Sequence, residues 1–270
     1  MDIPGQCPEY YRDKSAADSI KNTAAFIEAV KALEGNEKGF VLPSVNPRFV
    51  PTCSTEALRG LGELAQRYGF HVQTHCSEGD WEHNHVIDRL KKHDAFALDE
   101  MILVTRRTVL LWPIAHYQIS ILPNAVFPLK KALDKNLHVG LGTDIAGGRS
   151  PSVLDTCRHA VVASRVPEDG VDPNNDPEVQ AGWKDSRANF IETFWLATTQ
   201  GGVTLDLNIG KFAPGYAFNG LVMDVDAPGS NVRVFNSEDS LGDIFQKIVY
   251  NATNTNIMQT WVNGKLVHRR

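Results

Sequence analysis

The stretch Leu137-His-Val-Gly-Leu-Gly-Thr-Asp-Ile-Ala-Gly-Gly-Arg149 decides the fold. Val139 and Leu141 alternate with small residues as in a short buried strand, and the run ends in Thr143-Asp144 before a glycine turn and a helix. An acidic residue at the carboxyl end of a buried parallel strand is typical of α/β barrels, which keep their chemistry at that end. The stretch therefore predicts a parallel α/β fold with Asp144 as a functional residue.

A second strand end offers a partner for Asp144. Residues 70–75 (FHVQTH) form an apolar strand that ends in His75, and Glu78 follows in the loop just beyond. Zinc can be bound by an imidazole such as that of His75 and a strand-end carboxylate such as that of Asp144. A further carboxylate in a loop, such as that of Glu78, can carry protons. Ordinary interpretations stay open beside this one, because His75 could be a core histidine, Asp144 a helix N-cap and Glu78 a solvated loop residue.

Composition excludes several classes of protein. The 270 residues fit one barrel-sized domain or a barrel with a small appendage, and 42% of them are apolar. A net charge of -5 gives no reason to expect nucleic acid or an anionic membrane as a partner. No apolar run approaches the roughly 20 residues that span a bilayer. The N-terminus resembles no signal peptide, and the four cysteines are scattered without a C-x-x-C pair, so we expect reduced thiols and a cytoplasmic protein.

Helices and strands alternate along most of the chain. Helical periodicity predicts helices over 15–33, 55–68, 81–93, 128–136, 152–164 and 186–199, and apolar runs predict strands over 40–45, 70–75 and 108–112. The acidic, proline-bearing residues 167–182 predict a long surface loop. This alternation favours a parallel α/β sheet or barrel.

The pattern changes after Thr204. Short strands are predicted over 209–215 and 219–224, a helix over 241–250, and a hairpin over 258–267 with an Asn-Gly turn. We therefore expect residues 1–205 to belong to a metal-dependent hydrolase barrel and residues 206–270 to form a small C-terminal β-subdomain with one helix.

Three motifs resemble, in order and context, those of the guanine deaminase family, whose members are zinc (β/α)8 barrels of the amidohydrolase superfamily. They are Pro47-Arg48-Phe49, Gln73-Thr-His-Cys-Ser-Glu78 and Gly142-Thr-Asp-Ile-Ala-Gly-Gly148. The tail motifs Ile209-Gly-Lys-Phe212 and Val262-Asn-Gly-Lys265 look like the closing β-sandwich strands of that superfamily. The resemblance implies a hydrolase of cyclic amidines in purine catabolism. It would convert guanine to xanthine and ammonia and is expected to be a homodimer.

The resemblance also implies roles for single residues. His75 matches the zinc ligand on strand 5, and Asp144 matches the strand-8 aspartate that binds zinc and takes a proton from water. Glu78 matches the carboxylate that carries protons between water, the purine ring and the leaving ammonia. Arg48 and Phe49 match the pair that holds guanine, although Arg48 could also be a surface cation and Phe49 a core residue.

Two departures from the family pattern bear on activity. The H-x-H metal pair of strand 1 is missing, since His83-Asn-His85 has the spacing but lies in a predicted polar helix. About 62 residues separate Cys76 from His138, too few for three crossovers at roughly 30 residues each, and His116 is the candidate for the strand-6 histidine. We therefore expect an N-terminally truncated, internally shortened barrel covering the region of strands 4 to 8. Two alternatives stay open: a catalytically inactive fragment or paralogue, and another purine or pterin aminohydrolase.

Overall fold

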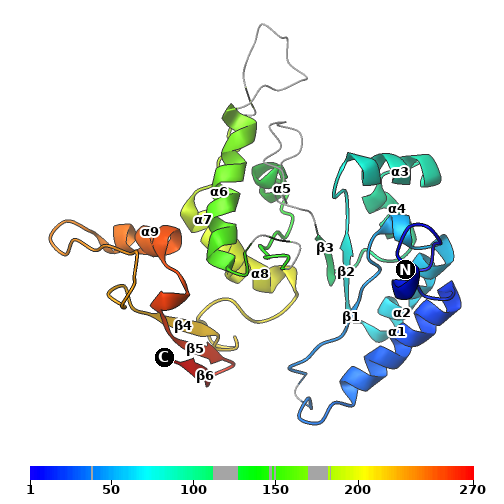
Figure 1. Ribbon diagram of the computed structural model, residues 1–270, viewed down its shortest axis with the longest axis horizontal. Helices are drawn as coiled ribbons and strands as arrows, with labels where there is room; N and C mark the ends of the chain where they lie inside the picture. The colour runs from blue at the N-terminus through cyan, green and yellow to red at the C-terminus, as the bar shows by residue number, and fades with distance from the viewer. Residues whose placement is uncertain (38, 112–126, 146–147, 149, 170–181, 183) are drawn as a thin grey trace, which may run out of the picture. The chain divides into compact units, whose positions relative to one another are not determined.

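The computed structural model describes all residues except 38, 112–126, 146–147, 149, 170–181 and 183. The chain divides into two compact units, Met1–Pro113 and Ile114–Arg270 (Figure 1). The domain boundary expected at residue 205 stays a prediction. His116, the candidate for the strand-6 histidine, and the last residue of the strand expected over 108–112 lie outside the described residues.

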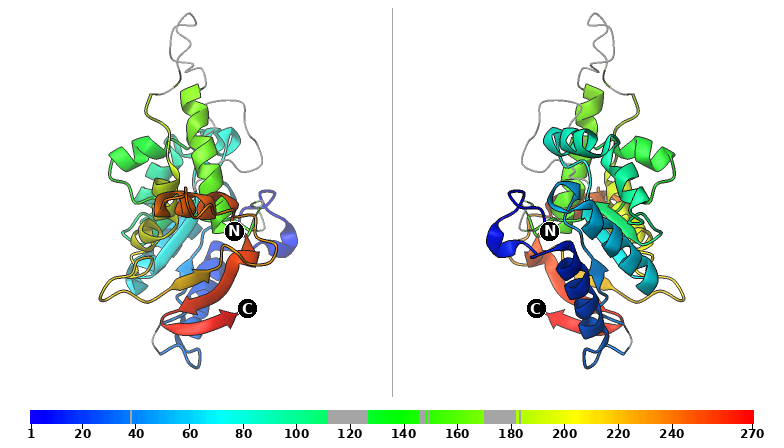
Figure 2. Two further views of the ribbon diagram at one scale, coloured as in Figure 1. Left: turned by 90° about the vertical axis from the view of Figure 1, so that its left-hand side faces the viewer. Right: turned by 90° about the vertical axis from the view of Figure 1, so that its right-hand side faces the viewer.

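The first unit contains a parallel sheet with helices around it. Its strands β1 (Ser44–Val45), β2 (His71–His75) and β3 (Thr108–Leu111) lie in the order β1-β2-β3. The sequence places α2 (Thr55–Tyr68) between β1 and β2, and α3 (Asp80–Leu90) and α4 (Asp94–Glu100) between β2 and β3. Ahead of the sheet come η1 (Glu9–Tyr11) and α1 (Ala16–Lys31), which packs on α2 (Figure 2), while η2 (Val50–Thr52) follows β1. This arrangement confirms the predicted parallel α/β class.

Local signals explain why these helices begin and end where they do. The Ser15 side chain accepts a hydrogen bond from the Asp18 amide at 3.1 Å at the start of α1, and Ser54 accepts one from Ala57 at 3.0 Å at the start of α2. Gly69 ends α2 in a left-handed conformation with φ 66°. The core between helices and sheet buries a contiguous apolar set that includes Ile27, Val45, Leu58, Leu61, Val72, Cys76, Val86, Leu98 and Leu103.

Two predictions for the first unit were wrong in extent. The strand expected over 40–45 is paired only at Ser44 and Val45, and Phe40 is 60% exposed. Upstream, the Asn36 side chain accepts from the Val41 amide at 2.8 Å and donates to the Val41 carbonyl at 2.9 Å, which replaces strand pairing there. The helix expected over 81–93 ends at Leu90 because Lys91 is left-handed with φ 57°, and α4 follows.

The regular structure described in the second unit consists of helices and an antiparallel sheet at its C-terminal end. Its helices are α5 (Leu129–Asp134), α6 (Val153–Asp169), α7 (Phe190–Ala197), α8 (Thr199–Thr204), α9 (Leu241–Asn251) and η4 (Asn254–Asn256). The sheet pairs β4 (Gly220–Met223), β5 (Ile257–Val262) and β6 (Lys265–Arg269) in that order. Helix α9 packs against α6 and α7 (Figure 2).

The C-terminal predictions were met in part. The hairpin β5–β6 is confirmed, with Asn263 and Gly264 both at positive φ as a type I′ turn requires. Helix α9 is confirmed as well. Residues 209–215 form turns in place of the expected strand, with Gly210 and Gly215 at positive φ.

The helix boundaries on either side of the expected acidic loop also differ from prediction. Helix α6 continues through Pro167 to Asp169, so the loop begins later than expected, and most of that loop lies outside the described residues. The helix expected over 186–199 begins at the Asn189 cap and breaks at Thr198, and the short helix α8, which contains Gly201 and Gly202, follows.

The stretch around Asp144 differs from its prediction. Residues 137–144 form neither helix nor strand, while Val139 and Leu141 are half-buried against Leu129, Ala188 and Leu196. A strand exists only through hydrogen bonds to a neighbour, and in the described part of this unit the strands pair only within β4-β5-β6. Across the described residues the strands form two three-stranded sheets, and no closed barrel is found. None of the described helices is long and apolar enough to cross a membrane.

Candidate active site at the carboxyl end of the parallel sheet

The carboxyl ends of β1 and β2 bring His75 against the backbone of Arg48. The Arg48 carbonyl accepts a hydrogen bond from the His75 amide at 3.0 Å and lies 2.9 Å from His75 Nδ1. Because a carbonyl oxygen can only accept, Nδ1 carries the proton and Nε2 keeps its lone pair. A backbone carbonyl that fixes the tautomer in this way is the usual second partner of a metal-binding histidine, so His75 fits the role of one metal ligand.

After β1 and β2 the chain carries an exposed cation, Arg48, a half-buried ring, Phe49, and an exposed ring, Trp81. The Arg48 guanidinium lies 5.6 Å from the centre of the Phe49 ring, and the Phe49 ring lies 6.4 Å from the Trp81 ring. Trp81 is 59% exposed and stacks on His85 at 5.3 Å. Aromatic rings can pack on the face of a planar heterocycle, and a guanidinium beside them can donate hydrogen bonds to its polar edge.

The loop that carries Glu78 is fastened by two buried carboxylates. The Glu78 amide donates to Glu82 Oε2 at 2.7 Å. The Ser77 amide and hydroxyl donate to Asp94 at 2.5 Å and 2.8 Å. Glu82 and Asp94 are each 2% exposed, whereas the Glu78 side chain is exposed.

Burial dominates the electrostatics beneath this loop. Desolvation raises the pKa of Glu82 to about 7, while the hydrogen bond from the Glu78 amide lowers it and the charge of Asp94 raises it. Burial, with Asp94 nearby, raises the pKa of the Cys76 thiol to about 12, so this cysteine is no nucleophile at neutral pH. Glu82 Oε1 is buried and has no hydrogen-bond partner among the described residues.

Sequence reasoning missed Glu82 and Asp94. One signal was available for Glu82: it stands four residues after Glu78, in the first turn of α3, where a carboxylate can accept the free amides that precede a helix. For Asp94 the sequence held no such signal, since its partner Ser77 lies 17 positions away.

Asp144 belongs to the second unit, so its expected place beside His75 and Glu78 stays a prediction. It is exposed and adopts φ 47°, a left-handed conformation that aspartate tolerates better than most residues. Its carbonyl accepts a hydrogen bond from the Gly148 amide, which closes the turn of the predicted motif.

The pair His83 and His85 does not assemble as metal ligands. His83 lies against His93, with ring centres 4.9 Å apart, while His85 stacks on Trp81. Residues two apart on a helix face different directions, which explains the divergence. Within the described ranges, no three His, Cys, Asp or Glu side chains are grouped so that they could hold a metal ion.

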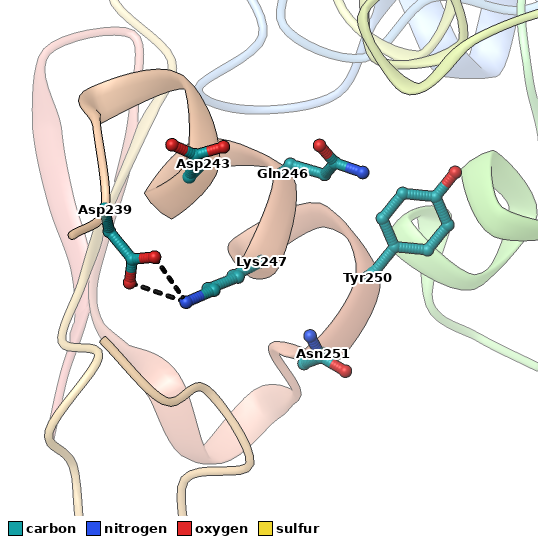
Figure 3. Close-up of a pocket in the computed structure, with 6 residues that line it drawn as sticks. All are labelled: Asp239, Asp243, Gln246, Lys247, Tyr250 and Asn251. Carbon is teal, nitrogen blue, oxygen red and sulfur yellow. Dashed lines mark hydrogen bonds and ion pairs between the residues drawn. The ribbon is translucent and has the colours of Figure 1, made fainter. Parts of the chain in front are cut away.

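A hollow on α9 is a second place where polar groups gather (Figure 3). It is lined by Asp239, Asp243, Gln246, Lys247, Tyr250 and Asn251. Lys247 donates to both Asp239 oxygens at 2.7 Å and 2.5 Å, so the two charges compensate each other. None of the predicted site residues lines this hollow, and we assign it no function.

Comparison with known families places this chain. The model of the amidohydrolase family matches residues 1–267, nearly the whole sequence. The chain therefore belongs to the amidohydrolase family.

Within that family the chain is similar to guanine deaminases. It is 31% identical to a probable guanine deaminase of Schizosaccharomyces pombe over 96% of this chain and 52% of that protein. A crystal structure of the guanine deaminase of C. acetobutylicum with bound guanine superposes with a TM-score of 0.78, at 25% identity over 99% of this chain and 64% of that one.

A more distant structure shares the fold. An atrazine chlorohydrolase of Arthrobacter aurescens, solved in complex with zinc, has a TM-score of 0.72 at 17% identity over 97% of this chain and 57% of that one. In these comparisons the chain spans between about half and two thirds of the length of each protein it matches.

Proposed function

We propose that this chain acts as a zinc-dependent guanine deaminase that hydrolyses guanine to xanthine and ammonia. The observation that carries the proposal is the arrangement at the carboxyl end of the parallel sheet. There the Arg48 carbonyl lies 2.9 Å from His75 Nδ1, which leaves Nε2 to bind a metal, and the Arg48 guanidinium packs on the Phe49 ring. Similarity to guanine deaminases over almost the whole chain supports the same activity.

The finer architecture is part of this proposal. The parallel sheet β1-β2-β3 would belong to the (β/α)8 barrel of the family, within its region of strands 4 to 8. His75 and Asp144 would be zinc ligands. A zinc ion held there would act as a Lewis acid that makes water nucleophilic at neutral pH. We also propose the homodimeric state and the cytoplasmic location implied by the resemblance.

The residues of this chain would handle the purine and its protons. Arg48 would donate to the polar edge of guanine, while Phe49 would pack against the ring face with Trp81 as its neighbour. Addition of water to the ring carbon that bears the amino group requires a proton on the adjacent ring nitrogen, and departure of ammonia requires another. Glu78 would carry both protons, since its exposed carboxylate is mounted on a loop that follows His75 directly.

A second candidate is a non-catalytic family member that binds a purine without converting it. It is favoured by one observation, that the described residues group no three potential metal ligands. Two protein ligands hold zinc far more weakly than the usual three or four. Another purine or pterin aminohydrolase remains an alternative as well, because an arginine and a phenylalanine do not specify guanine alone.

Zinc content and ammonia release, measured on the same purified sample, test the proposal. We expect close to one zinc ion per chain and ammonia formation that requires guanine. His75→Ala should lower zinc content and abolish ammonia release. His71→Ala is the matched control, since it removes another half-buried histidine from the same strand. Metal-free protein that releases no ammonia from guanine or other aminopurines would contradict the enzyme and favour the non-catalytic relative.

A further inference from the structure

We propose that Glu82 and Asp94 are positioning residues that fix the loop of residues 76–79 and thereby hold Glu78 at the carboxyl end of β2. The inference rests on the proposed function, because it deepens the role given to Glu78 there. Neither residue contacts the reacting atoms in this proposal, and each acts through the backbone of the loop.

The hydrogen bonds fasten two consecutive residues of the loop from two different helices. Glu82 on α3 accepts from the Glu78 amide, and Asp94 on α4 accepts from both the amide and the hydroxyl of Ser77. Two of the three donors are the neighbouring backbone amides of Ser77 and Glu78, so the path of the chain at Glu78 is fixed while its side chain stays exposed and able to move. This is what a proton carrier requires, since it must visit several atoms from one anchoring point.

The two carboxylates are mounted on rigid supports. Val86 on α3 and Ala97 and Leu98 on α4 lie in the same buried cluster as Val72 and Cys76 at β2. The strand that carries His75 and the helices that carry the two carboxylates therefore share one core. Functional groups are held accurately when their supports are fixed by packing in this way.

The arrangement costs stability, which argues against a purely structural origin. A buried carboxylate is expensive, and Glu82 Oε1 receives no compensating hydrogen bond from the described residues. Ser77 adopts φ 53°, a left-handed conformation that is unfavourable for serine. Here a strained backbone conformation and a buried carboxylate oxygen without a hydrogen-bond partner lie within a few residues of each other. Such costly features are typical of functional sites, where the surrounding structure holds them in place.

Glu82→Ala and Glu82→Gln in the full chain, supplied with zinc, test the inference. Alanine removes the acceptor of the Glu78 amide, whereas glutamine keeps a carbonyl oxygen in the same place. Asp88→Ala is the matched control, because it removes an exposed carboxylate from the same helix. Two quantities are measured on each protein: kcat and KM for guanine, and hydrogen exchange of the Ser77 and Glu78 amides relative to those of α2.

We expect Glu82→Ala to lower kcat about 10- to 100-fold with KM changed less than about threefold, as for a displaced catalytic group. The Glu78 amide should exchange at least about tenfold faster while the amides of α2 keep their protection. Glu82→Gln and Asp88→Ala should stay close to the parent protein in both measurements. If α2 loses protection in Glu82→Ala, Asp94→Ala takes its place, because alanine removes the acceptor of the Ser77 amide, and faster exchange at Ser77 with reduced kcat is the expected result.

The two measurements separate failure of the inference from failure of the proposed function. An active parent whose Glu82→Ala variant keeps both its kcat and the protection of Glu78 would overturn the inference alone. A parent that releases no ammonia, yet loses protection at Glu78 on Glu82→Ala, would overturn the proposed function and support the fixing of the loop. Equal loss of kcat in the alanine and glutamine variants would also count against the inference, because the acceptor oxygen would then not be the cause.

Discussion

At the scale of single residues, Glu82 combines burial with a titration near neutral pH. It is 2% exposed, and desolvation raises its pKa from the usual 4.5 to about 7. Between these two pH values the folded protein retains a proton that the unfolded chain has lost. The contribution of Glu82 to the free energy of unfolding is therefore fully present below about pH 4.5 and is lost as the pH rises through about 7.

This linkage predicts a pH-dependent difference between the parent protein and Glu82→Gln. Relative to the glutamine variant, which does not titrate, the parent should lose on the order of 3 kcal/mol of unfolding free energy between pH 4.5 and pH 8. Urea unfolding of both proteins at several pH values measures the difference directly, and other titrating groups cancel in it. A difference that stays constant across this range would mean that Glu82 titrates in the folded protein as it does in the unfolded chain.

At the scale of elements, two glycines of α2 meet very different neighbours. A Cβ added at Gly62 would lie 1.9 Å from the Met101 carbonyl oxygen, at the end of α4. One added at Gly60 would lie 2.1 Å from Cδ1 of Ile20, the end of a side chain on α1 that can turn away. The absence of a side chain at Gly62 thus lets Met101, at the end of α4, approach α2 closely. Because α4 also carries Asp94, this contact helps to place the carboxylate that holds the Glu78 loop.

Alanine at the two positions should separate these effects. Both substitutions gain up to about 1 kcal/mol of helix propensity. Gly62→Ala should nevertheless destabilise the protein by about 1–3 kcal/mol or more, because backbone must move, whereas Gly60→Ala should be close to neutral. Thermal or urea unfolding measures the stability of the two variants. Equal stability would show that the backbone at Met101 can move away from the added Cβ at little cost.

At the scale of the whole molecule, the proposed zinc ligands come from both units. His75 belongs to the unit Met1–Pro113 and Asp144 to the unit Ile114–Arg270. A ligand that binds only the folded state stabilises it, by about 2.7 kcal/mol at a free concentration one hundred times its Kd. Because zinc binding to these proposed ligands would be coupled to folding in this way, it would raise the free energy of unfolding.

Removal and return of zinc should reveal this coupling in calorimetry. We expect a chelator to lower Tm by several degrees and added zinc to restore it. His75→Ala and Asp144→Ala should each reduce the effect of zinc, while His71→Ala should leave it intact. A zinc response that survives in both ligand variants would place the metal elsewhere in the chain.

How much could be predicted from the sequence depends on where the deciding contacts lie. The helices α1, α2 and α9, strand β2 and the hairpin β5–β6 follow from local signals: caps, helical periodicity and an Asn-Gly turn. Those signals depend only on residues that are close in sequence, so the elements that they predict also form in the folded chain. The same holds for His75 and Glu78, whose places at a strand end and in the next loop were predicted from their neighbours.

The sequence by itself determined the parallel α/β class, the periodic helices and the motifs that place this chain beside the guanine deaminases. Tertiary structure decided that β1 has two residues, that the stretch before Asp144 forms no strand, and that Asp94 fastens Ser77 from 17 positions away. A strand depends on a hydrogen-bonded neighbour, and a buried carboxylate depends on donors brought to it by packing. Neither kind of partner is adjacent in sequence, which is why only the folded chain specifies them.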